Sequence, residues 1–127
     1  MDYHEWLSSK ITILMEELEE QLGRDFDYSL EVASGAAKHS EAMMHHRCCY
    51  HAPKECMGTV GVELVNSAFA DYNDGSIELT MRKIALDFVN SSEHHSSLRR
   101  YPVIGCGIAI REIENGVVLF VTLRLRS

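Results

Sequence analysis

The C-terminal part of the chain constrains its fold more than any other segment. Two apolar runs rich in β-branched residues, "VIGCGIAIREI" (103–113) and "GVVLFVTLRL" (116–125), lie on either side of a short polar link. Runs of this composition are typical of strands. The link contains Asn115-Gly116, and Asn-Gly is the strongest short hairpin signal because a type I′ turn needs positive φ at two successive residues. We therefore expect two antiparallel strands joined at Glu114-Asn115-Gly116.

Three stretches upstream have the spacing of amphipathic helices and could cover such a hairpin. The first has apolar residues every three or four positions and ends at Gly23, a common C-terminal signal. The second begins after Ser29, a favourable N-cap, and reaches about His46, with small residues such as Ala33 along one face. The third is expected to begin at Ser76.

One more strand completes the expected fold. The segment "TVGVELV" (59–65) lies between the second and third helices and is rich in β-branched residues. The order is then α-α-β-α-β-β, and helices layered on a sheet would bury all the apolar faces. The sequence predicts an α+β fold, an αβα sandwich of about three helices around a small, largely antiparallel three-stranded sheet. The length suits a single domain over residues 1–127.

Charge and hydropathy exclude some classes of protein. The net charge of −7 argues against a nucleic-acid partner, which normally faces a basic surface. No apolar run approaches the roughly 20 residues of a membrane span, so we expect no transmembrane segment. The N-terminus, "MDYHEWLSSK", lacks the basic and apolar regions of a signal peptide. Taken alone, it favours a cytoplasmic protein, unless a leader has been removed.

Three segments carry motifs in a characteristic order. The first, "LEVASGAAKHSEAMMHHRCCYH" (30–51), fits a helix pattern A-x-x-H-S-x-x-M followed by an aromatic pair and Ser-His. The second is "VGVELV" (60–65), and the third is "ALDFVNSSEHHSSLRRYPVIGCGIAI" (85–110). Over residues 5 to 126 these segments resemble the CAP superfamily (cysteine-rich secretory, antigen 5 and pathogenesis-related-1 proteins) in its compact prokaryotic form. The resemblance implies a single CAP-like domain.

The resemblance also assigns residues to a cleft. His51 matches the family's first cavity histidine, and Glu63 matches the glutamate of its Gly-Glu-Asn strand, with Leu64 in place of Asn. His94 matches the second cavity histidine, and His95 replaces an Arg. The family's second glutamate has no counterpart at its expected place. The other matching positions are Ala36, His39, Ser40, Met43, Asn90, Ser91, Ile104, Gly105, Gly107 and Thr122, and Phe88 stands for a Trp.

These residue types have a definite chemistry. Two neutral imidazoles, His51 and His94, can hold Zn²⁺ or another divalent metal and leave positions for water or a carboxylate. Glu63 could act as general base on a metal-bound water, or could fix the tautomer of a histidine. The resemblance therefore implies His51 and His94 as metal ligands and Glu63, His51 and His94 as candidate catalytic residues. No other cofactor is expected.

The predicted function is binding. We expect a CAP-like domain whose His/Glu cleft takes a divalent metal or a small ligand. The alternatives are a metal-dependent hydrolase or peptidase that uses the same cleft, and a non-catalytic protein-interaction module. The expected partners are a small molecule, a lipid or a protein. The resemblance favours a secreted protein, in contrast to the N-terminus.

The cysteines leave alternatives open. Cys48, Cys49 and Cys56 could join His51 in a structural zinc site, although their spacing is unusual for one. Cys48 or Cys49 could form a disulfide with Cys56 in an oxidising compartment. We favour a third interpretation, in which Cys48 and Cys49 fill the place of the aromatic pair that the family buries. Cys106 is expected to be a free, buried cysteine.

The remaining histidines receive separate expectations. His39 is expected to pack or form hydrogen bonds from its helix. His45 and His46 lie at a helix end, where a cation suits the helix dipole. His95 is a candidate extra member of the cleft because it adjoins His94.

Overall fold

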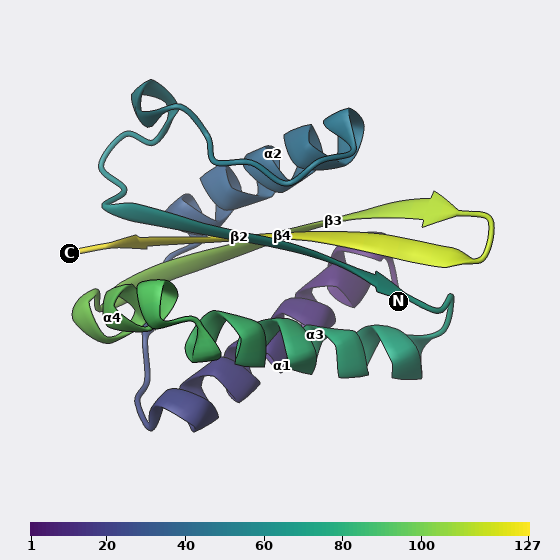
Figure 1. Cartoon of the computed structure of the whole chain (residues 1–127), viewed down its shortest axis with the longest axis horizontal. Coiled ribbons are helices and arrows are strands. Elements are labelled where there is room, and N and C mark those ends of the chain that lie inside the picture. The colour runs from purple at the N-terminus through teal and green to yellow at the C-terminus, as the bar shows by residue number, and fades with distance from the viewer.

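A mixed four-stranded sheet forms the middle layer of the molecule (Figure 1). The computed structural model describes residues 1–127. The strand order is β1-β3-β4-β2, with β1 parallel to β3 and the other two pairs antiparallel. The bounds are β1 (Asp27–Tyr28), β2 (Val62–Ala70), β3 (Val103–Ile113) and β4 (Gly116–Arg126). Because β2 pairs only with β4, its other side is a free edge of the sheet.

Helices cover both faces of this sheet. Figure 1 shows α2 on one face and α1 and α3 together on the other, with α4 at the end near the C-terminus. The bounds are α1 (Tyr3–Leu22), α2 (Leu30–His46), α3 (Asp74–Asn90) and α4 (Ser92–Arg100), and a 3₁₀ turn, η1, covers Lys54–Cys56. None of these helices has both the length and the apolar composition needed to cross a membrane.

The predicted fold class was wrong in the number of helices and strands and in the type of sheet. The structure has four helices and a four-stranded mixed sheet, where three helices and a largely antiparallel three-stranded sheet were expected. The strand β1 has only two residues, held by hydrogen bonds from Asp27 N to Pro102 O and from Ser29 N to Ile104 O. The helix α4 buries Leu98 alone, so it has no apolar stripe. Neither element leaves a periodic signal in the sequence.

The core lies between the sheet and the pair α1 and α3. Alternate residues of β4 face this core, and the residues between them face α2, as the period of two requires. The largest fully buried core side chains include Leu14, Leu18, Met81, Ile84, Phe88, Leu119 and Leu123.

Two glycines bring β3 unusually close to α2. A Cβ atom added at Gly105 would overlap the backbone of Ala33, and one at Gly107 would overlap the backbone of Ala37. Small residues on both elements therefore let the helix backbone lie directly on the strand. This contact sets the position of the face of α2 that carries His39 and Ser40.

The C-terminal hairpin forms, but its turn differs from the expected type. Ile113 pairs with Gly116, so Glu114 and Asn115 form the connection. Neither of these residues nor Gly116 has positive φ, which excludes the type I′ turn. Gly116 is required for another reason, since a Cβ atom there would overlap the carbonyl oxygen of Ala70 on β2.

Helix ends follow the capping signals, with one exception. The helix α1 ends at Gly23 in the left-handed conformation (φ 65°), and the Ser29 hydroxyl accepts from Val32 N at the start of α2, as predicted. The prediction for the third helix was wrong. Asn73 caps α3, and its side-chain oxygen accepts a hydrogen bond of 2.8 Å from Ser76 N. The strand β2 also starts later and runs further than expected, over Val62–Ala70.

The cap of α3 can be tested directly. Replacing Asn73 with alanine removes the acceptor for Ser76 N and should lower the free energy of unfolding by about 1 kcal/mol. Asn73→Asp keeps an acceptor and should stay within a few tenths of a kcal/mol of wild type. Urea denaturation followed by circular dichroism measures both. An equal loss in the two variants would show that the cap is not the cause.

Candidate functional site

A cleft of about 600 Å³ opens at the free edge of β2. Its walls come from the loop after α2, the first residues of β2 and the start of α4. His51, Glu63 and His94, which the sequence assigned to one cleft, all line it, and apolar side chains such as Leu64 line it as well. The cleft therefore joins residues that are distant in the sequence, such as His51 and His94, which lie 43 positions apart.

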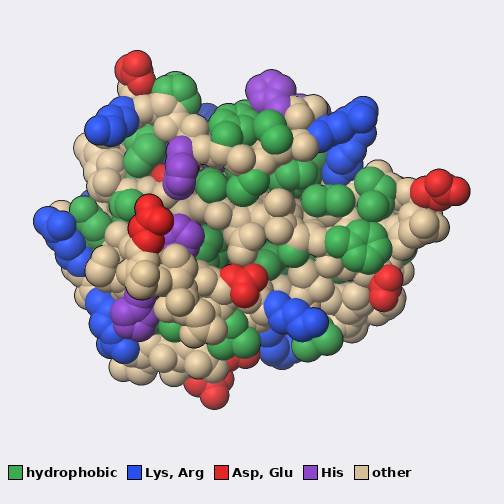
Figure 2. Space-filling model, in the orientation of Figure 1, with side chains coloured by type: hydrophobic (Ala, Val, Ile, Leu, Met, Phe, Trp, Pro, Cys, Tyr) green, Lys and Arg blue, Asp and Glu red, His purple; other side chains and the backbone are tan.

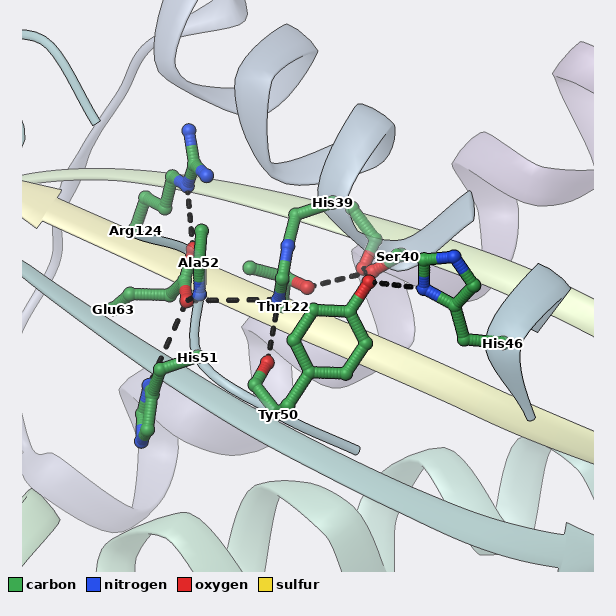
Figure 3. Close-up of polar contacts among 10 residues, drawn as sticks. His39, Ser40, His46, Tyr50, His51, Ala52, Glu63, Thr122 and Arg124 are labelled. Carbon is green, nitrogen blue, oxygen red and sulfur yellow. Dashed lines mark hydrogen bonds and ion pairs between the residues drawn. The ribbon is translucent and has the colours of Figure 1, made fainter. Parts of the chain in front are cut away.

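Glu63 is the buried centre of a polar network (Figure 3). Its side chain is only 1% exposed, and Oε2 accepts a hydrogen bond of 2.9 Å from Arg124 Nε. Oε1 accepts from the backbone N–H of Ala52 at 2.7 Å. The same oxygen lies 3.6 Å from His39 Nε2 and 3.6 Å from His51 Nδ1. Both oxygens of this carboxylate are thus engaged within the protein.

Two side chains of α2 also hold the loop that carries His51, through contacts with Tyr50. His39 Nε2 donates to the carbonyl oxygen of Tyr50 at 2.6 Å, which fulfils the expected hydrogen-bonding role of His39. His46 Nδ1 lies 2.7 Å from the Tyr50 hydroxyl (Figure 3). Since Ala52 N–H is bound by Glu63, both neighbours of His51 are anchored.

A separate buried hydroxyl pair joins α2 to the sheet. Ser40 Oγ donates to the carbonyl oxygen of Gly107 at 2.9 Å and lies 2.8 Å from Thr122 Oγ1. Both side chains are fully buried, so this pair joins α2 to β3 and β4 where water is excluded. It supports the site without reaching the cleft.

The two histidines of the cleft differ in their surroundings. His51 has 63% of its side chain exposed, and its ring extends away from the network in Figure 3. His94 lies on α4, and its ring meets the ring of Phe88 edge to face, with 5.7 Å between centroids. His94 Nδ1 is buried and has no hydrogen-bond partner in the protein. A buried polar atom without a partner is costly, so this nitrogen destabilises the folded protein at this position.

His95, the candidate extra member, lies outside the cleft. Its Nδ1 donates to the carbonyl oxygen of Val89 at 3.0 Å, and its Nε2 accepts from Arg99 Nε at 3.2 Å. Both ring nitrogens are therefore satisfied away from the site. Glu93 and Ser97 line the cleft instead, and neither was predicted to do so. Their spacing of four residues places them on one face of a helix, but α4 itself was not predicted.

No complete metal site exists among residues 1–127. No group of three or more His, Cys, Asp and Glu side chains is arranged to hold a metal ion. Glu63 is committed to Arg124 and Ala52, so it does not complete a ligand set with His51 and His94. The zinc site stays a prediction that rests on these two histidines.

Comparison with known proteins gives information on the fold. No family model matches the chain, and no curated protein matches it in sequence. Among solved structures, an outer surface protein from Borrelia burgdorferi is similar, with a TM-score of 0.64, 13% identity and 94% of each chain covered. A likeness at this identity shows a shared fold over nearly the whole length. The resemblance to the CAP superfamily stays a prediction.

The cysteines do not take the place that we favoured for them. Cys48 and Cys49 are exposed, so they do not fill a buried aromatic position, and Cys56 is exposed as well. All four thiols are free in this structure. Cys106 is buried, as expected, and burial raises its pKa to about 12. Partial desolvation by the surrounding atoms, and then the charge of Cys48, raise the pKa of Cys49 although its side chain reaches the surface.

Proposed function

We propose that this protein is a binding domain and that its cleft takes a small polar ligand or a divalent cation between His51 and His94. The observation that carries the proposal is that His51 and His94 line one cleft, while Nδ1 of His94 is buried without a partner in the protein. The volume of about 600 Å³ is typical of small-molecule sites.

The anchoring of the loop supports the same proposal. Tyr50 and Ala52 are both tied to buried side chains, so His51 projects into the cleft from a fixed backbone. A backbone that is already ordered loses little freedom when a ligand binds, which favours affinity. Zn²⁺ is the natural probe, because neutral imidazoles are among its usual ligands and the resemblance to the CAP superfamily points to the same pair.

The contacts of Glu63 favour binding over hydrolysis. A general base needs a free oxygen within reach of the proton that it removes. Glu63 uses Oε2 for Arg124 and Oε1 for Ala52 N–H, and its side chain is almost fully buried. We therefore assign Glu63 the role of a positioning residue that holds the loop beside the cleft.

Calorimetric titration with Zn²⁺ tests the site. The wild type should bind one zinc ion, and His51→Ala and His94→Ala should each weaken binding by at least about tenfold, because each removes one of two protein ligands. His45→Ala is the control, since His45 is exposed at the end of α2 and should bind as the wild type does. Circular dichroism confirms that each variant is folded.

Three outcomes would contradict this proposal in different ways. If the wild type binds no zinc, the proposal of a metal ligand is wrong. Small polar molecules are then tested as ligands by the shift of the His94 ring signals. Unchanged binding in both histidine variants places the zinc elsewhere. Binding that is lost only in Cys48, Cys49 or Cys56 variants would favour a structural zinc site.

A further inference from the structure

A second pocket lies at the opposite end of the sheet from the cleft. It has a volume of about 320 Å³ and lies between the first turns of α1 and α3 and the hairpin end of β3 and β4. Glu112 of this pocket pairs with Val117, next to the turn, whereas Glu63 of the cleft pairs with Arg124 near the far end of β4. The N-terminus and the β3–β4 turn lie at the same end of the sheet in Figure 1. The two sites are therefore separate.

Aromatic rings form part of the wall of this pocket. Tyr3 and Trp6 are stacked, with 6.1 Å between ring centroids and 23° between planes. Tyr72 also lines the pocket, and Tyr3 and Tyr72 are 56% and 67% exposed. Aromatic rings ordinarily bury their large apolar surface, and apolar surface left exposed marks an interaction site.

Carboxylates form the rest of the polar wall. Asp74 Oδ1 accepts a hydrogen bond of 2.9 Å from Trp6 Nε1, and Glu112 Oε1 accepts one of 2.9 Å from the Tyr72 hydroxyl. Each bond uses one oxygen of its carboxylate, so the other oxygen can face a ligand. The hydrogen bond and the charge of Glu112 raise the pKa of Tyr72, which keeps this phenol protonated as a donor.

One cationic side chain of the protein, Lys10, lies beside this wall, but its charge does not neutralise the carboxylates there. Lys10 is buried, with its Nζ 3.1 Å from Glu78 Oε1 and 3.6 Å from Asp74 Oδ1. The same nitrogen lies 5.2 Å from the centre of the Trp6 ring. Glu78, Asp74 and Glu112 thus outnumber the single ammonium group, and the net charge of −7 adds to the attraction of a cation. Figure 2 shows acidic side chains scattered singly over one view of the molecule, with basic side chains among them.

We propose that this pocket binds a small organic cation, an alkylated ammonium head group, with Tyr3 and Tyr72 against its methyl groups and Asp74 and Glu112 as its counter-charges. A desolvated cation over aromatic faces gains energy from the ring quadrupoles, and alkylated ammonium groups are recognised in this way by aromatic cages. The pocket volume suits a head group rather than a large molecule. This site does not depend on the cleft, and its test does not involve zinc.

The single tryptophan of the chain makes the test direct. Trp6 lines the pocket, so its fluorescence reports binding there alone. Choline should change this fluorescence in a saturable way. The uncharged isostere 3,3-dimethylbutan-1-ol, which has the same shape, should bind at least about tenfold more weakly, because cation–π attraction and counter-charges are lost together. Phosphatidylcholine vesicles form a separate arm, in which competition by free choline shows that a lipid head group also enters the pocket.

Charge-matched variants complete the experiment. Glu112→Gln should weaken choline binding by about tenfold, since it removes a counter-charge from the wall. Glu114→Gln removes the same charge from the exposed turn and should leave binding unchanged. Equal affinity for choline and its uncharged isostere would overturn the proposal. So would equal effects of the two glutamate variants, or the absence of any saturable response in both Trp6 fluorescence and the N-methyl proton signal of choline.

Discussion

Replacing Gly107 with alanine should destabilise the domain by about 3 kcal/mol or more, or prevent folding altogether. The added Cβ would overlap backbone atoms of Ala36 and Ala37 on α2. A flexible side chain can move aside at low cost, but backbone atoms in a helix cannot. Relief would require α2 to lift from the sheet, and this would stretch the bond from Ser40 Oγ to Gly107 O. Urea denaturation followed by circular dichroism measures the loss.

Gly75→Ala is the matched control for this prediction. Gly75 lies in the first turn of α3, where the nearest atom to an added Cβ would be Asn73 Oδ1 at an ordinary 3.5 Å. Alanine in a helix is favoured over glycine, so this variant should equal the wild type or gain up to about 1 kcal/mol. If Gly107→Ala unfolded at the same urea concentration as the wild type, the close approach of α2 to β3 would be disproved.

Replacing Arg124 with methionine should cost about 3–5 kcal/mol, because it leaves the Glu63 carboxylate buried without its cation. The side chains of Arg124 and Glu63 are only 7% and 1% exposed, so water cannot take the place of the guanidinium. The damage should extend to the cleft, since Glu63 also accepts from Ala52 N–H and so holds the loop that carries His51. Denaturation gives the loss in stability, and amide chemical shifts of the loop report its position.

A second substitution separates the contribution of the Glu63–Arg124 ion pair from that of the other contacts of Glu63. In the double variant Glu63→Leu with Arg124→Met no buried charge remains, and much of the lost stability should return. Arg126→Met is the control, because Arg126 lies at the end of β4 and its guanidinium donates to the carbonyl oxygen of Ser127 rather than to a carboxylate, so the loss should stay within about 0.5 kcal/mol. A double variant less stable than Arg124→Met by itself would argue that Glu63 stabilises the fold through Ala52 rather than through Arg124.

Several elements of the fold follow from short-range chemistry and were predicted at their observed ends. Gly23 ends α1 because it adopts positive φ, and Ser29 begins α2 because its hydroxyl accepts from Val32 N. The hairpin strands were predicted from β-branched residues, although the turn between them is of another type. The end of β2 and the N-cap of α3 were predicted at the wrong residues. The link between these elements holds several polar residues that can each end a strand or cap a helix.

The candidate site was predicted only in part. The motif resemblance selected His51, Glu63 and His94, and the three side chains do line one cleft. The partner of Glu63 was not predicted, although the sequence contains a signal for it. Arg124 is the only charged residue in the apolar run 117–125, whose composition is typical of a buried strand. A charge in such a strand requires an opposite charge nearby.

The division between the two levels of structure has a physical basis. Capping, turn composition and hydrophobic spacing act over a few residues, so the chain specifies most of its helices and strands through local interactions alone. Contacts between distant segments follow from packing. Two glycines of β3 let α2 approach, and this approach sets where His39 meets the loop before Glu63. The pairing of β1 with β3, the docking of α4 and the burial of the Glu63–Arg124 pair depend on surfaces that exist only after the layers assemble.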